Sequence, residues 1–319
     1  MLDVFLTNDV EIWCNGWDNL DAAFPSSFRK YIHGPTARGE FGLTYQFQVL
    51  NDHGLRGVFF IEPLFARRFG QAPLDEIVGL TKAAGQEIQL HLHTEWADEA
   101  TPALVPGMTR KRQNIRDFTY EEQTTLIGIG LDLLRQAGAH EVNAFRAGSF
   151  GFNRDTLRAL AAHGIRFDSS YNPTMYGLES GLAPGAMLTE PYLEDGVYEF
   201  PLTVYRDGRG LRHTQLTSCS TAELEGLLWQ ALEQGRQSFV LLFHSFELLT
   251  SSKERADPVV LDRFRKLCRF LEKNSDCFNT RGFVGLEPRA VGPQPDPLTS
   301  PLYRTGFRMM QQALRRAYG

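Results

Sequence analysis

Short apolar runs alternate along this chain with longer segments in which apolar residues recur at helical spacing. The short runs predict strands, and the longer segments predict the helices that connect them. The predicted strands span residues 4–6, 57–61, 87–93, 143–146, 165–168, 197–204, 238–244 and 283–286, and the predicted helices span residues 44–53, 74–84, 119–137, 153–163, 221–234 and 258–273. This order of elements predicts an α/β fold built from βαβ units.

The run at 238–244 is almost entirely apolar, as expected for a strand in a parallel sheet that is covered on both faces. Thr119 with Glu122 three positions later has the pattern of a capping box and opens the longest predicted helix. We therefore expect an irregular (β/α) barrel of about seven strands, and a doubly wound open sheet is the alternative.

The last part of the chain differs in composition from the rest. Five prolines lie between Pro288 and Pro301, and proline can neither continue a helix nor donate to a sheet ladder. We expect the barrel to span residues 1–287, followed over residues 288–319 by a proline-rich linker and a basic amphipathic helix. This helix, at 305–318, would dock on the barrel or on a second subunit, or contact an anionic membrane surface.

The overall composition excludes several classes of function. A formal net charge of -5, from 33 basic and 38 acidic residues, does not provide the clustered cations that a nucleic-acid-binding protein needs. The four cysteines lie far apart, so neither a thiolate zinc site nor a redox pair is predicted. Neither a secretory leader nor a long apolar span is recognisable, and we expect a soluble, cytoplasmic protein.

Polar clusters directly follow several predicted strands, which places their side chains at one rim of a barrel. In the first cluster, Asp9 and Glu11 are two positions apart, so both point into the same cavity if the strand continues through them. Such a pair suits one carboxylate that binds a metal and one that acts as a base. The alternative is that both acids cap the following helix.

The second cluster contains residue types that bind divalent cations. If the strand period of residues 87–93 continues to residue 95, His91, His93 and Glu95 lie on one side of it. Their nitrogen and oxygen atoms are the ligands that zinc and similar ions accept. The sequence therefore predicts a divalent metal site here, with zinc as the expected ion.

Three further residues at predicted strand ends fit acid and base chemistry. His244 ends the most apolar strand, where a buried imidazolium needs a partner, and we expect it to act as a general acid. Asp168 is a plausible partner, because a carboxylate would raise the pKa of the imidazole and fix its tautomer. Arg146 would hold Asp9 ionised and oriented, or would form a structural ion pair.

The order of these clusters resembles the five motifs of the polysaccharide deacetylase family, the NodB-homology carbohydrate amidohydrolases. The resemblance extends over residues 2–286 and includes the stretch Tyr198-Glu199-Phe200-Pro201. It implies that Asp9 is the base, that Arg146 orients it and that His244 is the acid. The residues that it implies for the remaining places are Glu11 and His91 as metal ligands and Asp168 as the aspartate of the fourth motif.

Two positions depart from the family pattern. The commonest first motif has adjacent aspartates, whereas Val10 follows Asp9 here, and Asp9-Val10-Glu11 resembles the aspartate-x-aspartate form of some members. The second motif normally ends in a histidine, but this chain has Glu95 there, with His93 in between. The implied ligand set is therefore Glu11 with His91 and either Glu95 or His93.

The resemblance implies a metal-dependent hydrolase that removes an N-acyl group, acetyl or formyl, from a sugar. Because no export leader is recognisable, we expect an intracellular substrate, such as a lipid-linked or nucleotide-linked precursor of a surface polysaccharide. The terminal helix would then hold the protein at the inner face of the membrane. The alternatives are an amidohydrolase acting on a small non-sugar amide, and an inactive carbohydrate-binding or scaffold protein.

Overall fold

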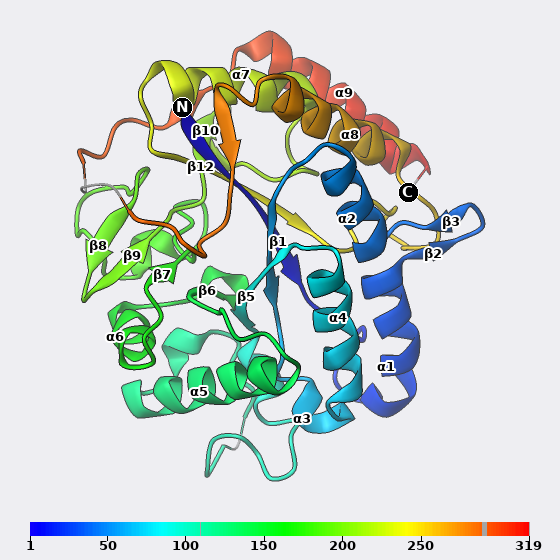
Figure 1. The fold of residues 1–319 in the computed structure, drawn as a ribbon, viewed down its shortest axis with the longest axis vertical. Coiled ribbons are helices and arrows are strands. Elements are labelled where there is room, and N and C mark those ends of the chain that lie inside the picture. Colours follow the sequence, from blue (N-terminus) through cyan, green and yellow to red (C-terminus); the bar gives the residue numbers. More distant parts are fainter. Residues whose placement is uncertain (109, 289–291, 319) are drawn as a thin grey trace.

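A computed structural model describes residues 1–108, 110–288 and 292–318, and a curled nine-stranded sheet forms its centre (Figure 1). The strands of this sheet are β1 (Leu2–Val10), β4 (Gly57–Ile61), β5 (Glu87–Leu92), β6 (Ala144–Ala147), β7 (Phe167–Asp168), β8 (Tyr192–Glu194), β9 (Val197–Glu199), β12 (Ser238–His244) and β13 (Phe278–Thr280). Their order is β12-β1-β4-β5-β6-β7-β9-β8, and β13 pairs with the start of β1. Within the described sheet, only the β8 and β9 pair is antiparallel.

Helices cover the outer face of the curled sheet (Figure 1). They are α1 (Leu20–Phe28), α2 (Leu43–Asp52), α3 (Ala66–Phe69), α4 (Ala72–Ala83), α5 (Tyr120–Gln136), α6 (Arg154–Ala162), α7 (Thr221–Glu233) and α8 (Pro258–Lys273). A ninth helix, α9 (Leu302–Tyr318), lies outside them and packs on α7. The predicted capping box of Thr119 and Glu122 opens α5. Helix α1 was not predicted, because Pro25 interrupts its pattern. Among the described helices, none combines the length and the apolar content that a membrane span requires.

The curled parallel sheet confirms the predicted (β/α) barrel, although the barrel closes irregularly. The chain between β9 and β12 bridges the two sides of the opening. The Phe200 N–H donates to the Asp168 carbonyl at 2.7 Å, and the Thr203 N–H donates to the Val240 carbonyl at 3.2 Å. The predicted strand at 197–204 is therefore interrupted, because Pro201 lies within it and has no N–H to donate.

One predicted strand is wrong. Residues 283–286 form no strand, and β13 at Phe278–Thr280 pairs with β1 in their place. Phe283 is nonetheless fully buried inside the barrel, and its N–H donates to the Glu87 carboxylate at 2.7 Å. The apolar run therefore predicts burial correctly. The backbone N–H of Phe283 is satisfied by the Glu87 side chain, however, and not by the strand-to-strand hydrogen bonds that we expected.

A second, three-stranded sheet connects the end of the chain to the barrel. Its strands are β10 (Val204–Arg206), β11 (Leu211–His213) and β14 (Leu298–Thr299), and β14 pairs with β10. The proline-rich segment that we expected to be a linker thus contains a paired strand; residues 289–291 of that segment lie outside the described residues. The strands β2 (Pro35–Thr36) and β3 (Gly39–Glu40), of two residues each, form a separate small hairpin.

Side chains that point into the barrel form layers along its axis. The deepest layer is aromatic, with Phe5 and Phe283 stacked at a centroid distance of 4.9 Å and joined by other phenylalanines from neighbouring strands. Strand side chains alternate, so the next inward positions after Phe5 on β1 are Thr7 and Asp9; β1 ends at Val10, and Glu11 directly follows it. The interior therefore changes from apolar to ionisable toward the carboxyl ends of the parallel strands.

Candidate active site

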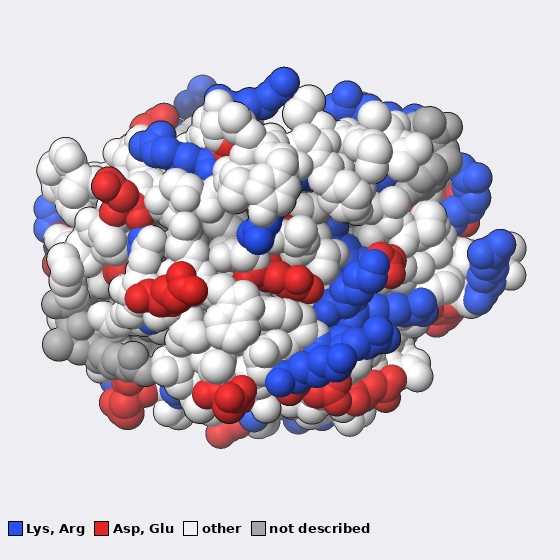
Figure 2. Space-filling view, turned by 90° about the horizontal axis from the view of Figure 1, so that it is seen from above, with Lys and Arg blue, Asp and Glu red and all other residues white. Residues whose placement is uncertain are grey.

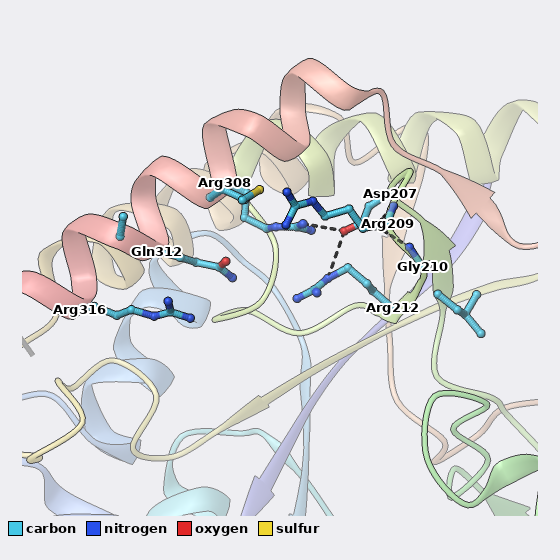
Figure 3. A pocket seen from close by; sticks show the side chains of 10 residues that line it. Asp207, Arg209, Gly210, Arg212, Arg308, Gln312 and Arg316 are labelled. Carbon is cyan, nitrogen blue, oxygen red and sulfur yellow. Dashed lines mark hydrogen bonds and ion pairs between the residues drawn. The ribbon is translucent and has the colours of Figure 1, made fainter.

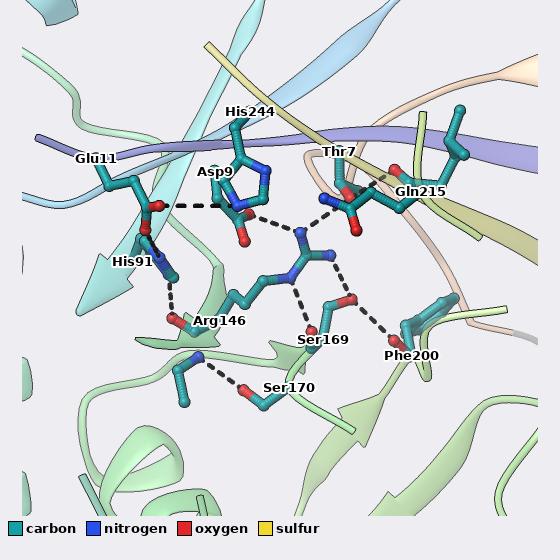
Figure 4. Close-up of polar contacts among 12 residues, drawn as sticks. Thr7, Asp9, Glu11, His91, Arg146, Ser169, Ser170, Phe200, Gln215 and His244 are labelled. Atoms are coloured by element: carbon teal, nitrogen blue, oxygen red, sulfur yellow. Dashed lines mark hydrogen bonds and ion pairs between the residues drawn. The ribbon is translucent and has the colours of Figure 1, made fainter. Parts of the chain in front are cut away.

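Ionisable side chains meet at the carboxyl ends of four strands, and we call this group the rim site; Figure 4 labels its members other than His93. Its members come from β1, β5, β6 and β12 or from the residues that follow them. They are Asp9, Glu11, His91, His93, Arg146 and His244. All except His244 are buried, and His244 is partly exposed. The structure thus brings six of the eight predicted site residues together directly.

Three members of the rim site form a cluster that could hold a cation. Glu11, His91 and His93 each offer one ligand atom, and these atoms lie within 4.8 Å of one another. The closest approach is between Nε2 of His93 and a Glu11 oxygen, at 2.6 Å, and Nε2 of His91 lies 3.6 Å from the same oxygen. Two imidazoles and one carboxylate form the kind of three-ligand set that leaves open positions on zinc.

The His91 imidazole is oriented by a hydrogen bond on the side of the ring that faces away from Glu11. Nδ1 of His91 lies 2.8 Å from the Arg146 carbonyl oxygen, so this nitrogen carries the proton and Nε2 presents its lone pair to the site. In the described structure, Nε2 of His91 is buried and has no hydrogen-bond partner. A buried nitrogen without a donor or acceptor is costly, and a cation beside Glu11 would satisfy it. The residues present therefore fit a divalent metal.

Glu95 lies outside the ligand cluster. The strand alternation ends at Leu92, and Thr94–Trp96 turns into a 3-10 helix, so Glu95 no longer shares the face of His91 and His93. Its carboxylate lies behind His93 instead, where Nδ1 of His93 donates to it at 3.3 Å. The prediction that all three share one face is therefore corrected, and the geometry favours His93 as the third ligand.

A glycine makes room for this arrangement. Gly148 follows β6, and a Cβ atom at this position would lie 2.7 Å from Nδ1 of His93 and 2.7 Å from the Leu92 carbonyl oxygen. Contacts that short do not occur between real Cβ atoms and their neighbours, so any other residue would displace the His93 ring. The glycine at this place is explained by the close approach of two backbone segments.

Charges in the cluster are strongly coupled. Burial alone would raise the pKa of Glu11, but the neighbouring imidazoles hold it well below 4.5. Burial would likewise lower the pKa of His93, and the Glu11 carboxylate beside it raises that pKa well above 6.5. A further acid, Glu62, accepts from the Leu64 N–H at 2.8 Å, and burial raises its pKa to about 8. The ionised Glu11 carboxylate therefore favours a positive charge on the imidazole beside it.

Arg146 fixes the position of Asp9. The guanidinium is fully buried and lies 2.7 Å from an Asp9 oxygen, and it also donates to Thr7 and to both the carbonyl and the hydroxyl of Ser169. It lies over the Phe60 ring at 4.4 Å. These contacts hold the guanidinium in place, and through it the Asp9 carboxylate at the rim. Asp9 and Glu11 do not cap helix α1, whose first turn has no side-chain cap.

His244 is paired with a residue that the sequence did not single out. Its Nδ1 donates to Glu247 at 2.7 Å, and its Nε2 faces the site, 3.8 Å from a Glu11 oxygen. Burial opposes protonation, but Glu247 and Glu11 together raise the pKa of His244 to about 9. The ring is therefore a cation near neutral pH. We had expected Asp168 as its partner, and the structure corrects this pairing.

Asp168 takes part in a different buried contact. Ser170 donates to one of its oxygens, and the Glu199 carboxyl lies beside the other on the neighbouring strand β9. Burial raises the pKa of Asp168 to about 6, and burial together with the Asp168 charge raises the pKa of Glu199 well above 4.5. One proton shared between the two carboxyl groups accounts for this pair. Asp168 thus lies behind Arg146 rather than beside the acid.

Aromatic rings pack around the rim site. Trp13 meets the His93 ring edge-on at 4.8 Å, Trp17 packs on Trp96 at 4.8 Å, and Phe246 lies 5.2 Å from the His244 ring. Trp13 and Trp17 are partly exposed. These rings provide apolar walls beside the ionisable groups.

Sequence reasoning missed Glu247 and Glu62. Glu247 stands three positions after His244, and a carboxylate at that spacing beside a candidate acid is a recognisable signal. Glu62 directly follows β4 and so has the same relation to its strand as the predicted site residues. Applying the same criterion to every strand end would have found it.

Comparisons with known proteins rest on structure alone. No family model matches the sequence, and no curated protein matches it. A crystal structure from Mycobacterium smegmatis, provisionally named a polysaccharide deacetylase, superposes with a TM-score of 0.54 at 20% identity over 92% of this chain and 94% of that one. The chain has the polysaccharide deacetylase fold.

Two other solved structures with this fold superpose more loosely. A family 4 carbohydrate esterase from Streptomyces lividans gives a TM-score of 0.41 at 12% identity, over 87% of this chain and 89% of that chain. A family 4 pseudoenzyme from Bacillus anthracis gives a TM-score of 0.40 at 12% identity, over 86% of this chain and 60% of that chain. Superpositions this loose carry no information about the rim site.

Proposed function

We propose that this protein is a metal-dependent hydrolase that removes an N-acyl group from a sugar. The observation that carries the proposal is the position of an acid and a base on adjacent strands beside one set of metal-ligating atoms. Nε2 of His244 lies 3.8 Å from a Glu11 oxygen, and Asp9 on β1, two residues before Glu11, is paired with His244 on β12. The polysaccharide deacetylase fold agrees with this chemistry.

Glu11, His91 and His93 would hold the metal. A divalent cation bound there would polarise the acyl carbonyl and lower the pKa of water. The Arg146 and Glu95 side chains contribute from behind, the first by fixing Asp9 and the second by orienting His93. Zinc suits two imidazoles and one carboxylate, and we propose it as the ion.

Asp9 and His244 would divide the proton transfers. Asp9, held in place by Arg146, accepts a proton from the attacking water as the C–O bond forms. His244, with a pKa of about 9, holds a proton at Nε2 and donates it to the amine as the C–N bond breaks. The products are a free carboxylate and an amino sugar, so the water supplies the hydroxyl group and the protons balance.

The proposed acyl group is acetyl or formyl, and the proposed substrate is an intracellular sugar on the way to a surface polysaccharide. Such sugars are carried either by a lipid or by a nucleotide. The apolar outer face of α9 supports the lipid carrier, because it would hold the protein where a lipid-linked sugar resides.

Amine release tests the proposal. The purified protein would be incubated with N-acetyl and N-formyl sugars, each free, nucleotide-linked and lipid-linked, and with small non-sugar amides. We expect release from a sugar, abolished by a chelator and by His91→Ala and restored to the chelated wild type by zinc. Release from the small amides alone would favour a general amidohydrolase, and sugar binding without release would favour an inactive carbohydrate-binding protein.

A further inference from the structure

Helix α9 is attached to the protein through its arginines. Arg308 is 2% exposed and donates to Asp207 at 2.6 Å and to Glu223 at 3.2 Å. Arg315 donates to Asp257 at 2.7 Å, at the start of α8. The charged side of this helix therefore faces the barrel, where a surface helix usually places its apolar side.

The opposite side of α9 is apolar and faces solvent. Tyr303, Phe307, Met310 and Leu314 follow one another at intervals of four, three and four, so they form one stripe along the helix. They are 72%, 47%, 53% and 54% exposed. Figure 2 looks onto the side of the molecule that carries α7, α8 and α9, and shows uncharged surface bordered by lysine and arginine side chains and, in places, by aspartate and glutamate side chains.

A pocket of about 510 Å³ lies beside this stripe, between α9 and the turn that joins β10 to β11 (Figure 3). Arg209, Arg212 and Arg316 line it, and Arg209 and Arg316 form no ion pair with a described residue. Nε of Arg212 is buried without a hydrogen bond, 3.7 Å from an Asp207 oxygen that already accepts from Arg308. The pocket thus presents guanidinium donors that lack acceptors.

We propose that the apolar stripe of α9 and this arginine pocket together bind the surface of a membrane that contains anionic phospholipid. The stripe would enter the boundary between headgroups and acyl chains, and the pocket would receive phosphate groups of the same leaflet. An apolar helix face bordered by cations is the combination that such a surface binds.

A second copy of the chain explains the surface less well. In a two-fold dimer the same patch meets itself, so each copy must supply counter-charges for the other. Helix α9 contains four arginines and no aspartate or glutamate, and Arg209 and Arg212 extend the cationic border. A self-contact would place these cations near one another, whereas anionic headgroups would neutralise them.

The membrane surface would lie one strand away from the rim site. Arg212 and His213 are neighbours on β11, so their side chains point to opposite faces of the strand. Arg212 lines the pocket, while Nε2 of His213 lies 3.1 Å from Gln215, which donates to Glu247, the partner of His244. A sugar carried by a lipid in the bound leaflet would therefore have a short path to the acid.

Vesicle sedimentation tests this proposal without any measurement of turnover, so its result is independent of the proposed activity. The full chain would be mixed with vesicles of phosphatidylcholine alone and of phosphatidylcholine with phosphatidylglycerol. We expect binding to the mixed vesicles that weakens as salt rises. Arg209→Gln with Arg316→Gln should weaken it on the order of 30-fold, from two lost cation contacts.

Phe307→Ser with Leu314→Ser should abolish binding to the mixed vesicles. The matched controls are Arg135→Gln with Arg158→Gln, which removes two exposed arginines elsewhere, and Leu178→Ser with Leu193→Ser, which removes two exposed leucines elsewhere; both should bind as the wild type does. No binding by the wild type, equal binding to both vesicles, or equal loss in the controls would overturn the proposal. A dimer in light scattering that Phe307→Ser with Leu314→Ser dissociates, without vesicle binding, would assign the stripe to a second copy.

Discussion

Two buried clusters of this protein are each built around an arginine, and they differ in what their carboxylates face. In the rim site, Arg146 holds Asp9, whose carboxylate lies at the open end of the barrel beside the cation-binding cluster. In the second cluster, which we call the α9 anchor, Arg308 is held by Asp207, Glu223 and the Tyr205 hydroxyl. There the donors and acceptors all belong to the contact between α9 and the barrel.

The difference shows how a structural ion pair is distinguished from a functional one. Burial does not separate them, since Arg146 and Arg308 are equally inaccessible. Their surroundings separate them. The rim site contains a buried imidazole nitrogen of His91 without a hydrogen-bond partner and a His244 ring with a raised pKa, and both lie beside Glu11. We therefore expect changes in the rim site to affect chemistry and changes in the α9 anchor to affect stability.

The largest expected effect comes from the same substitution made in both clusters. Asp9→Asn removes a general base while keeping an oxygen near Arg146, so amine release should fall by a factor on the order of 10² to 10⁴. Asp207→Asn removes the corresponding carboxylate of the α9 anchor, and its turnover should stay within about twofold of wild type. Steady-state kinetics on both folded variants is the measurement. Equal losses would remove the distinction between the clusters.

Breaking the α9 anchor should have the next largest effect. Arg308→Leu leaves Asp207 and Glu223 buried without their cation, which should lower the free energy of unfolding by about 3–5 kcal/mol. Arg135→Leu, at an exposed ion pair on α5, serves as the control and should change it by less than about 0.5 kcal/mol. Urea titration followed by circular dichroism gives both values. A stable Arg308→Leu protein would mean that the ion pairs do not hold α9 in place.

The identity of the third metal ligand can be tested by comparing His93 with Glu95. His93→Ala removes a proposed ligand and should weaken zinc binding by more than about 100-fold, whereas Glu95→Gln removes only the group that orients it and should weaken binding about 10-fold to 100-fold. Zinc affinities from competition with a chromogenic chelator provide the comparison. The reverse order of effects would make Glu95 the ligand.

The pH dependence of amine release reports on His244. Because the acid must hold its proton, activity should fall as pH rises through the pKa of His244, which is about 9. Glu247→Gln removes the partner that raises this pKa, so the alkaline limit of activity should move to lower pH. A pH profile of kcat/KM measures the shift. An unchanged alkaline limit in the variant would show that another group is the acid.

The smallest expected effect concerns stability in the metal-free protein. Glu62 has a pKa of about 8 when folded, compared with 4.5 as its usual value, so the folded state holds one more proton than the unfolded state between these values. Stability of the wild type should therefore fall as pH rises from about 5 to 8, with about 1.4 kcal/mol per pH unit due to Glu62. In urea titrations at several pH values, the free energy of unfolding of Glu62→Gln should therefore fall less steeply with pH than that of the wild type. An identical slope in both proteins would mean that Glu62 ionises normally.

The sequence predicted those parts of the fold that depend on local patterns. Strand β12 and helix α8 have the bounds that their apolar run and helical periodicity indicated, and the capping box opens α5 as expected. The barrel followed from the alternation of strands and helices. The clustering of polar residues at one rim followed from their positions at strand ends.

What the sequence could not supply were contacts between distant segments and the points where periodicity stops. Glu95 was placed on the wrong face because the strand period was extended to it beyond residue 93, whereas β5 ends at Leu92 and a 3-10 helix begins at Thr94. The partner of His244 was misassigned because Asp168 and Glu247 both follow plausible patterns, and only the fold brings Glu247 to the ring. Periodicity also identified the two faces of α9 but not that its arginines turn inward.

A zinc titration followed by amine release tests the central claim most directly. Chelator-treated wild-type protein would receive zinc in steps while amine release from an N-acylated sugar is measured. If Glu11, His91 and His93 hold a catalytic metal, activity should be absent at the start, rise in proportion to added zinc and level off at one equivalent. Full activity without metal, or none at any metal content on sugars that the protein binds, would contradict the account.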